Sequence, residues 1–173
     1  MEGEFFLSQA GNEVLIKAVI QAIPTYAMSI FQLPKTLCQK INSMMSRFWW
    51  GHKDNYSQIA WRGWKSLGLA KGKGGMGFWD IECFNQAMLA KQGWRILKNP
   101  TSLTALVLKA KYYPHGSFIE STLGSWPSYA WRSLWKAKKL LKEGTIWRIG
   151  NGQDVKIWGD RWIPPNYFHY AIS

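Results

Sequence analysis

Apolar residues follow helical spacing over the first 51 residues, and two prolines interrupt them. Ser8 is a residue type that commonly caps a helix, and apolar positions recur after it up to Pro24, which kinks or restarts a helix. A further apolar run leads to Pro34, a residue that favours the first position of a new helix, and Gly51 is a typical terminator. The pattern therefore predicts a helical segment over residues 1–51.

The rest of the chain divides into a loop region and a second helical region. Residues 52–79 are rich in Gly, Lys and Trp and lack a period, so we expect a loop with short turns. Periodic spacing returns over residues 80–144, where Asp80 and Ser128 are typical N-caps. The expected helices run over 81–98, from 103 to before Pro114, and from 128 to 143, with Gly144 closing the last one.

The spacing within these three helices also predicts which face of each is buried. Apolar residues that recur at intervals of three, four and seven mark the inner face of an amphipathic helix. The expected inner faces are Ile81, Phe84, Met88 and Leu89 in the first helix, Leu103, Leu106, Val107 and Ala110 in the second, and Trp131, Leu134, Trp135 and Leu141 in the third.

Residues 145–173 predict a β-hairpin followed by an irregular tail. The runs TIWRI and DVKIW flank Gly150-Asn151-Gly152, a typical hairpin turn. A loop with an odd number of residues places Trp147, Ile149, Val155 and Ile157 on one face against the helices, with Arg148 and Lys156 on the other. The predicted fold is mainly α: an irregular helical bundle with a small C-terminal β-hairpin.

The composition shows that the chain carries a strong positive charge. The chain has 173 residues, of which 47% are hydrophobic, so we expect a folded core and one compact unit. Lys and Arg number 22 against 10 Asp and Glu, and the formal charge is +12. Such a charge favours nucleic acid or an anionic membrane surface as the partner. The longest uncharged run, 18–34, contains two prolines and several polar residues, so we expect a buried helix and no membrane span.

The basic residues concentrate in the loop region and in the last helix. Residues 62–111 contain nine Lys and Arg against two acids, and the helix that begins at Ser128 has five before Glu143. A basic helix face is often only solvated surface, and contact with phosphates is the alternative that the net charge favours. The candidate nucleic-acid-binding residues are Arg62, Lys65, Lys71, Lys73, Arg132, Lys136, Lys139, Arg148 and Lys156.

The sequence leaves two possible roles for the 12 tryptophans. Exposed tryptophans stack on the bases of nucleic acids. Their helical spacing favours core packing for most of them.

Patterns typical of catalytic and metal sites are missing from the sequence. Two-metal phosphoryl transfer needs several converging carboxylates, and the chain has no Asp-Asp pair. The three histidines lack the spacing of a zinc site, and Cys38 and Cys83 form neither a CxxC motif nor a disulfide framework. We therefore expect no catalytic residue, no metal, no cofactor and no small-molecule substrate.

One motif formally suggests a nucleotide site. Residues 72–77 match the pattern GxGxxG, but a dinucleotide site needs a buried strand before it, and none is predicted. We expect a flexible turn that leads into the helix capped by Asp80. The alternative is that Lys71 and Lys73, together with exposed backbone amides, contact a nucleic-acid phosphate.

Six longer runs of residues form a specific pattern that covers most of the chain. They are LSQAGNEVLIKAVIQAIPTYAMSIFQLPK (7–35), RFWWG (47–51), GGMGFWDIECFNQAMLAKQGWRIL (74–97), LKAKYYP (108–114), SYAWRSLWKAKKLL (128–141) and WRIGNGQDVKIWGDRWIP (147–164). Together they resemble the reverse-transcriptase polyproteins of plant LINE-type (non-LTR) retrotransposons, often named "putative ribonuclease H" proteins. They are also similar to reverse-transcriptase-related open reading frames of plant mitochondrial genomes.

The resemblance implies a position after the polymerase palm, with a thumb-like segment over 1–51 and a connection segment over 80–144. The family is an RNA-directed DNA polymerase, but its Tyr-x-Asp-Asp motif, RNase H carboxylates and Cys/His knuckle have no match in this sequence. We expect a non-catalytic fragment that binds RNA or DNA weakly and without sequence preference. The alternative is a partner-binding or membrane-surface module that uses exposed Trp and basic residues. The resemblance implies a nuclear location, or a mitochondrial one if the gene lies in the organelle.

Overall fold

The computed structural model describes residues 8–51 and 59–146, and within them it is mainly α-helical with no strand. The predicted hairpin, with the faces assigned to Arg148 and Lys156, lies outside these residues apart from its first two positions. The elements are α1 (Gln9–Leu15), the π-helix η1 (Ile16–Ile20), α2 (Thr25–Ile30), α3 (Lys35–Trp49), α4 (Trp64–Leu67), the 3₁₀ helix η2 (Lys71–Lys73), α5 (Ile81–Lys98), α6 (Leu103–Tyr112) and α7 (Tyr129–Gly144).

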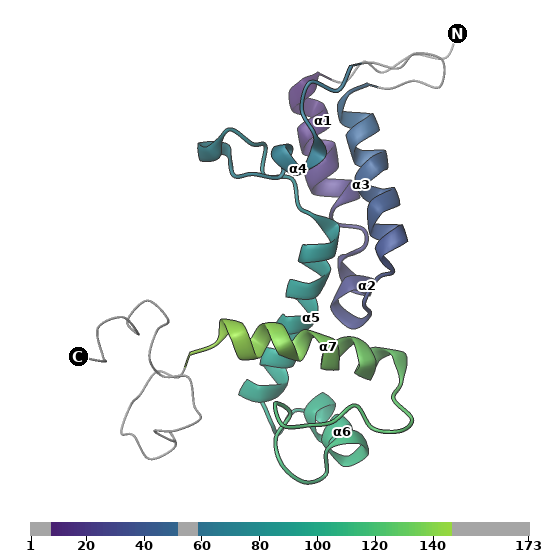
Figure 1. Ribbon diagram of the computed structural model, residues 1–173, viewed down its shortest axis with the longest axis vertical. Coiled ribbons are helices and arrows are strands. Elements are labelled where there is room, and N and C mark those ends of the chain that lie inside the picture. The colour runs from purple at the N-terminus through teal and green to yellow at the C-terminus, as the bar shows by residue number, and fades with distance from the viewer. Residues whose placement is uncertain (1–7, 52–58, 147–173) are drawn as a thin grey trace, which may run out of the picture.

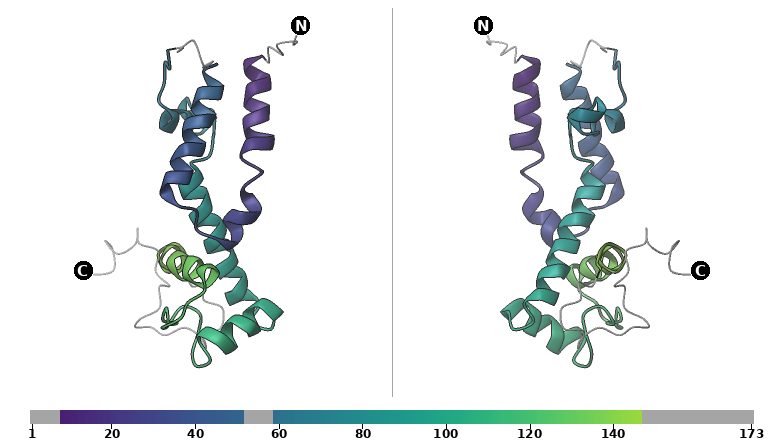
Figure 2. Two further views of the ribbon diagram at one scale, coloured as in Figure 1. Left: turned by 90° about the vertical axis from the view of Figure 1, so that its right-hand side faces the viewer. Right: turned by 90° about the vertical axis from the view of Figure 1, so that its left-hand side faces the viewer.

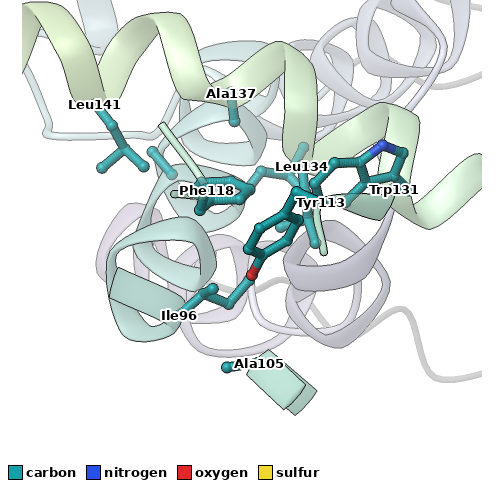
Figure 3. Close-up of a cluster of buried hydrophobic side chains, with 10 residues drawn as sticks. Ile96, Ala105, Tyr113, Phe118, Trp131, Leu134, Ala137 and Leu141 are labelled. Atoms are coloured by element: carbon teal, nitrogen blue, oxygen red, sulfur yellow. The ribbon is translucent and has the colours of Figure 1, made fainter. Parts of the chain in front are cut away.

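Two hydrophobic cores lie along α5, one toward each end of this helix (Figures 1 and 2). Helices α1 to α3 and the segment around α4 lie at one end of the molecule, and α6 and α7 lie at the other, where α7 crosses α5. The N-terminal core consists of Ile16, Met28, Cys38, Met45, Trp49, Leu67, Phe78 and Ile81. The C-terminal core consists of Leu89, Ala90, Ile96, Ala105, Tyr113, Phe118, Trp131, Leu134, Ala137 and Leu141 (Figure 3).

The predicted helix caps are present. The backbone N–H of Gly11 donates to Ser8 Oγ at 3.2 Å, that of Cys83 to Asp80 Oδ1 at 3.0 Å, and that of Trp131 to Ser128 Oγ at 3.2 Å. Each bond satisfies a backbone donor that the first turn of a helix leaves without an intrahelical acceptor.

Helix boundaries lie near Pro24, Pro34 and Gly51, as the sequence predicts, but not always at the expected residue. The first helical stretch ends at Ile20, four residues before Pro24, and α2 begins directly after this proline, while Gly51 terminates α3 with a φ of 67°. Pro34 has an extended ψ of 139° and precedes α3 as its N-cap, so it is not the first helical residue. The π-helical turn of η1 was not anticipated, because nothing in the periodicity distinguishes it from an α-helix.

The predicted inner faces hold for α5 and α7 and are wrong for α6. Leu103 is 78% exposed, Leu106 52% and Val107 56%, and Ala110 is also exposed. The helix instead turns Ala105 into the C-terminal core, with Leu108 and Tyr112 packed beside it. Helix α6 carries apolar residues on all sides, so its periodicity has no single phase and the neighbouring elements select the buried face.

Besides the continuous helix α5, the short segment between α2 and α3 joins the two halves. The buried amide of Asn85 on α5 donates to the carbonyls of Met28 and Phe31 at 2.8 and 2.9 Å, and its Oδ1 accepts the N–H of Leu33 at 2.8 Å. Helix α7 holds the same segment, because Ser133 Oγ accepts the N–H of Gln32 at 2.9 Å. The α5–α7 pair is therefore tied to the N-terminal half by hydrogen bonds to backbone groups.

Candidate nucleic-acid interface

Helix α7 presents three of the predicted basic residues on one solvent-facing row. Arg132, Lys136 and Lys139 are all exposed, and they lie on the side opposite the buried residues Trp131, Leu134, Ala137 and Leu141. Arg132 and Lys139 are seven residue steps apart, or about 10 Å along the helix axis. Lys139 Nζ lies 3.8 Å from Glu143 Oε1, an exposed pair that contributes little to stability. The amphipathic pattern of α7 thus positions the row that the sequence predicted.

A fourth basic residue of α7 has a different environment. Lys138 is buried, and its ammonium donates to the carbonyl of Ser121 and lies 5.1 Å from the ring centroid of Trp135. Burial, with a smaller contribution from the charge of Lys142, lowers the pKa of Lys138 below its ordinary value. Lys138 therefore packs inside the protein and does not add to the basic surface, although the count of basic residues in the sequence included it.

The four predicted residues of the loop region lie around α4 and η2, and two of them are engaged within the protein. Arg62 donates to the carbonyl of Gly74. Lys71 Nζ lies 2.8 Å from Glu13 Oε1, which also accepts Lys17 Nζ at 2.7 Å. These two ammonium groups lower the pKa of Glu13. Lys71 is thus partly neutralised by α1.

Lys65 and Lys73 are the remaining two residues of this group. Both are exposed, and neither pairs with a carboxylate of the described residues. In the loop region, Lys65 and Lys73 therefore have no carboxylate partner among the described residues. Arg62 and Lys71, in contrast, form contacts that hold the loop in place.

One interpretation of the sequence expected exposed backbone amides in the glycine-rich turn, but five consecutive N–H groups of this turn are bonded within the protein. The N–H groups of residues 73–77 all donate to carbonyls of the segment 67–71, at 2.8 to 3.2 Å. A Cβ at Gly75 would lie 2.0 Å from the carbonyl oxygen of Leu69, so this position requires glycine for close packing of the two backbone segments. Residues 73–77 of the GxGxxG match therefore form a tightly closed turn, and a phosphate contact by these residues depends on side chains.

The structure does not bring the two basic groups into one site. Residues 59–80 pack against the N-terminal core, whereas α7 covers the C-terminal core on the other half of the molecule (Figure 1). Two further candidates, Arg148 and Lys156, lie outside the described residues. The basic surface is consequently divided between two regions rather than gathered in one groove.

A third basic row was missed as a candidate. Lys91, Arg95 and Lys98 are exposed on α5, together with Trp94. Their spacing of three, four and seven residues places them on one helix face. The row could have been identified from this spacing in the sequence. The count of basic residues over 62–111 did not show it, because a count does not tell which residues share one face of a helix.

The carboxylates of the described residues all have structural partners. Asp80 caps α5. Glu13 pairs with Lys17 and Lys71, Glu82 with Lys35, Glu120 with Ser117, and Glu143 with Lys139. Over residues 8–51 and 59–146, no group of three metal-ligating side chains comes together.

Both cysteines lie within the described residues. Cys38 is buried, Cys83 is exposed, and both are free thiols. None of the described helices combines the length and the apolar character that crossing a bilayer requires.

Comparison with known proteins supports the resemblance. The chain is 46% identical over 143 residues to the "Uncharacterized mitochondrial protein AtMg00310" of Arabidopsis thaliana, and the match covers 82% of this chain and 93% of that protein. The chain belongs to the family of this plant mitochondrial protein. No family model and no solved structure matches the chain.

A second relative connects this family to a longer protein. The chain is 31% identical over 162 residues to the "Putative ribonuclease H protein At1g65750" of Arabidopsis thaliana, a match that covers 91% of this chain. It covers only 26% of that relative, so the chain spans about a quarter of its length. The two matches confirm the predicted kinship with plant mitochondrial reading frames and with proteins named for ribonuclease H, and they are consistent with a retrotransposon-related protein from plants.

Proposed function

We propose that this chain is a non-catalytic piece of a LINE-type reverse transcriptase, and that it binds RNA or DNA weakly and without sequence preference. The observation that carries the proposal is the solvent-facing row of Arg132, Lys136 and Lys139 in a chain of formal charge +12. Contacts to phosphates need only cations at the surface, and they carry no sequence information. Lys65 and Lys73 provide a second, smaller contribution on the other half of the molecule.

The occupied carboxylates support the non-catalytic part of the proposal. Each acid among the described residues caps a helix, pairs with a lysine or bonds a serine, and no three metal-ligating side chains of these residues converge as a shared metal ion would require. We expect the purified chain to show neither primer extension nor RNA cleavage with Mg²⁺ or Mn²⁺. Activity that survives repurification and is lost in Asp80→Asn would contradict this expectation.

Binding is tested by titrating a labelled duplex and a labelled single strand at several salt concentrations. We expect dissociation constants of about 10⁻⁴ to 10⁻⁶ M at physiological salt, and a linear fall of log affinity with log salt concentration. The double variant Arg132→Glu/Lys136→Glu removes two phosphate contacts, so the slope for the duplex should flatten by about two.

A matched control separates a local effect from a change in net charge. Lys40 and Arg47 are exposed on α3, and Lys40→Glu/Arg47→Glu exchanges the same two residue types for glutamate. We expect this control to weaken binding less and to leave the slope nearly unchanged. An equal effect of the two double variants would show that α7 is not the binding face, and binding that is insensitive to salt would overturn the proposal.

A protein-partner role is the second candidate function, and the exposed apolar face of α6 favours it. Leu103, Leu106 and Val107 are each at least half exposed on one side of this helix, which is unusual for three large apolar side chains in a row. If the face is an interface between copies of this chain, the wild type should self-associate in sedimentation velocity and Leu106→Glu should remain monomeric. A monomeric wild type at high concentration would count against a homotypic contact.

A further inference from the structure

The C-terminal half of α5 has two sharply different faces. Leu89, Ala90 and Ile96 belong to the C-terminal core, and Gly93 lies among them. A Cβ at Gly93 would lie 2.7 Å from Leu141 Cδ1, so glycine at this position allows α7 to approach closely. The opposite face consists of the exposed residues Lys91, Trp94, Arg95 and Lys98.

This outer face, which we call the α5 row, combines a large aromatic ring with three cations. Trp94 is 42% exposed, and Lys98 Nζ lies 5.8 Å from the centroid of its ring. No carboxylate of the described residues pairs with Lys91, Arg95 or Lys98. The only acid of α5 is Glu82, in its first turn, about 12 residues or three turns before Trp94.

Trp94 differs from Trp79, which lies just before α5, in what its ring contacts, and it differs from the more exposed Trp61 and Trp126 in lying on a helix face that also carries three basic residues. Trp79 is also 42% exposed, but its ring stacks on Phe84 at a centroid distance of 4.1 Å. No aromatic side chain of the described residues stacks on Trp94. Trp94 is thus an indole whose exposed surface is bordered by cations rather than by another ring.

We propose that the α5 row binds single-stranded RNA or DNA, with an unpaired base stacked on Trp94 and the flanking phosphates held by Lys91, Arg95 and Lys98. An exposed indole with neighbouring cations fits a single strand because every base has a stacking face and every nucleotide a phosphate. A duplex keeps its bases stacked inside and offers only its phosphates to such a row. The inference rests on the proposed function and adds to it a separate site with a preference for unpaired strands.

The α5 row is a different surface from the basic row of α7. On α5, the row points away from Gly93, the position that contacts α7. On α7, Arg132, Lys136 and Lys139 point away from the residues buried against α5. The two rows therefore lie on the two outer sides of the α5–α7 pair, and variants in one do not remove cations from the other.

The test compares Trp94→Ala with the wild type on an oligothymidylate and on a duplex of equal length. We expect Trp94→Ala to weaken binding of the single strand about tenfold and to change duplex binding less than about twofold. Trp94→Tyr keeps an aromatic ring and should retain most of the single-strand affinity. Tyr26→Ala removes a 78% exposed ring from α2, away from the row, and should change neither affinity.

A crosslinking experiment on the wild type avoids any dependence on the folding of variants. An oligothymidylate carrying 5-iodouracil is irradiated on the protein, and the modified peptide is located by mass spectrometry. We expect the crosslink in the peptide Gln92–Arg95, which contains Trp94. Crosslinks confined to other tryptophans would overturn the inference.

The outcomes separate this inference from the proposed function. Equal losses of single-strand and duplex binding in Trp94→Ala, or no loss at all, would refute the α5 row while leaving salt-dependent binding through α7 intact. A wild type that binds neither nucleic acid would refute the proposed function, and the inference with it.

Discussion

The two cores of the molecule differ in how completely they satisfy their polar groups. In the C-terminal core, Trp131 stacks on Tyr112 at 4.6 Å between centroids, and its indole N–H donates to the carbonyl of Leu123 at 3.1 Å. Trp135 likewise donates to the carbonyl of Ser121 at 3.1 Å. Trp131 and Trp135 thus contribute large apolar rings to this core and have satisfied indole donors.

The N-terminal half is built from shorter pieces and leaves polar atoms without partners. Its core combines residues from η1, α2, α3, α4 and the start of α5. Gln21 is completely buried, and both polar atoms of its side chain lack a hydrogen-bond partner among the described residues, as does the indole N–H of Trp50. Because an unsatisfied buried amide costs about 1–3 kcal/mol, we expect the N-terminal half to open before the C-terminal half.

The largest expected effect is on the C-terminal core. Trp131→Ala removes a fully buried indole together with its stacking on Tyr112, and should lower the free energy of unfolding by about 4 kcal/mol. Denaturant unfolding followed by circular dichroism measures this change. Met28→Ala in the N-terminal core should cost less, because a core assembled from short segments collapses more readily around a cavity. A larger loss of stability for Met28→Ala than for Trp131→Ala would show that the N-terminal core is the more rigidly packed of the two.

The next effect concerns the connection between the halves. Asn85→Ala leaves the carbonyls of Met28 and Phe31 and the N–H of Leu33 without their side-chain partner, and should cost about 2–3 kcal/mol. It should also separate the unfolding transitions of the two halves when they are followed by hydrogen exchange. Gln86→Ala, an exposed change on the same helix, is the control and should be nearly neutral. A single cooperative transition in Asn85→Ala would show that other contacts join the halves.

A stabilising change tests the weakness of the N-terminal half. Gln21→Met replaces an amide that lacks partners by an apolar side chain of similar volume, and should stabilise this half by about 1 kcal/mol. Cys38 is buried in the same half, so its alkylation requires opening and should slow about fivefold in the variant. The exposed Cys83 provides the reference rate within the same molecule. Unchanged labelling of Cys38 would mean that Gln21 has a partner in solution.

The smallest effect, and the one that depends on pH, concerns Lys138. Its pKa lies below the ordinary value of 10.5, so the unfolded chain binds more protons between the two values and wild-type stability rises with pH through that window. Lys138→Met should be more stable than the wild type by up to about 1 kcal/mol at pH 7, with the gap narrowing toward pH 10.5. The carbonyl of Ser121 keeps its bond from Trp135 in this variant. Lys136→Met, an exposed change on α7, should show no such pH dependence.

Local features of the fold follow from short stretches of sequence. Ser8, Asp80 and Ser128 cap the helices for which they were predicted, because a cap depends on only three or four consecutive residues. The exposed row of Arg132, Lys136 and Lys139 also follows from sequence, since α7 has a single apolar phase that leaves one side polar. The mainly α fold class rests on the same kind of local pattern.

Features that depend on contacts between distant segments could not be predicted in this way. The buried face of α6, the burial of Lys138 and the role of Asn85 all depend on residues that are remote in sequence, such as the bond between Leu33 and Asn85. The division of the basic residues between two halves has the same origin. Periodicity and capping act within one helix and therefore determined the helices and their polar rows. The partner of each face, and the separation of the α5 and α7 rows, arise only when α7 packs across α5, because burial is a property of the assembled helices.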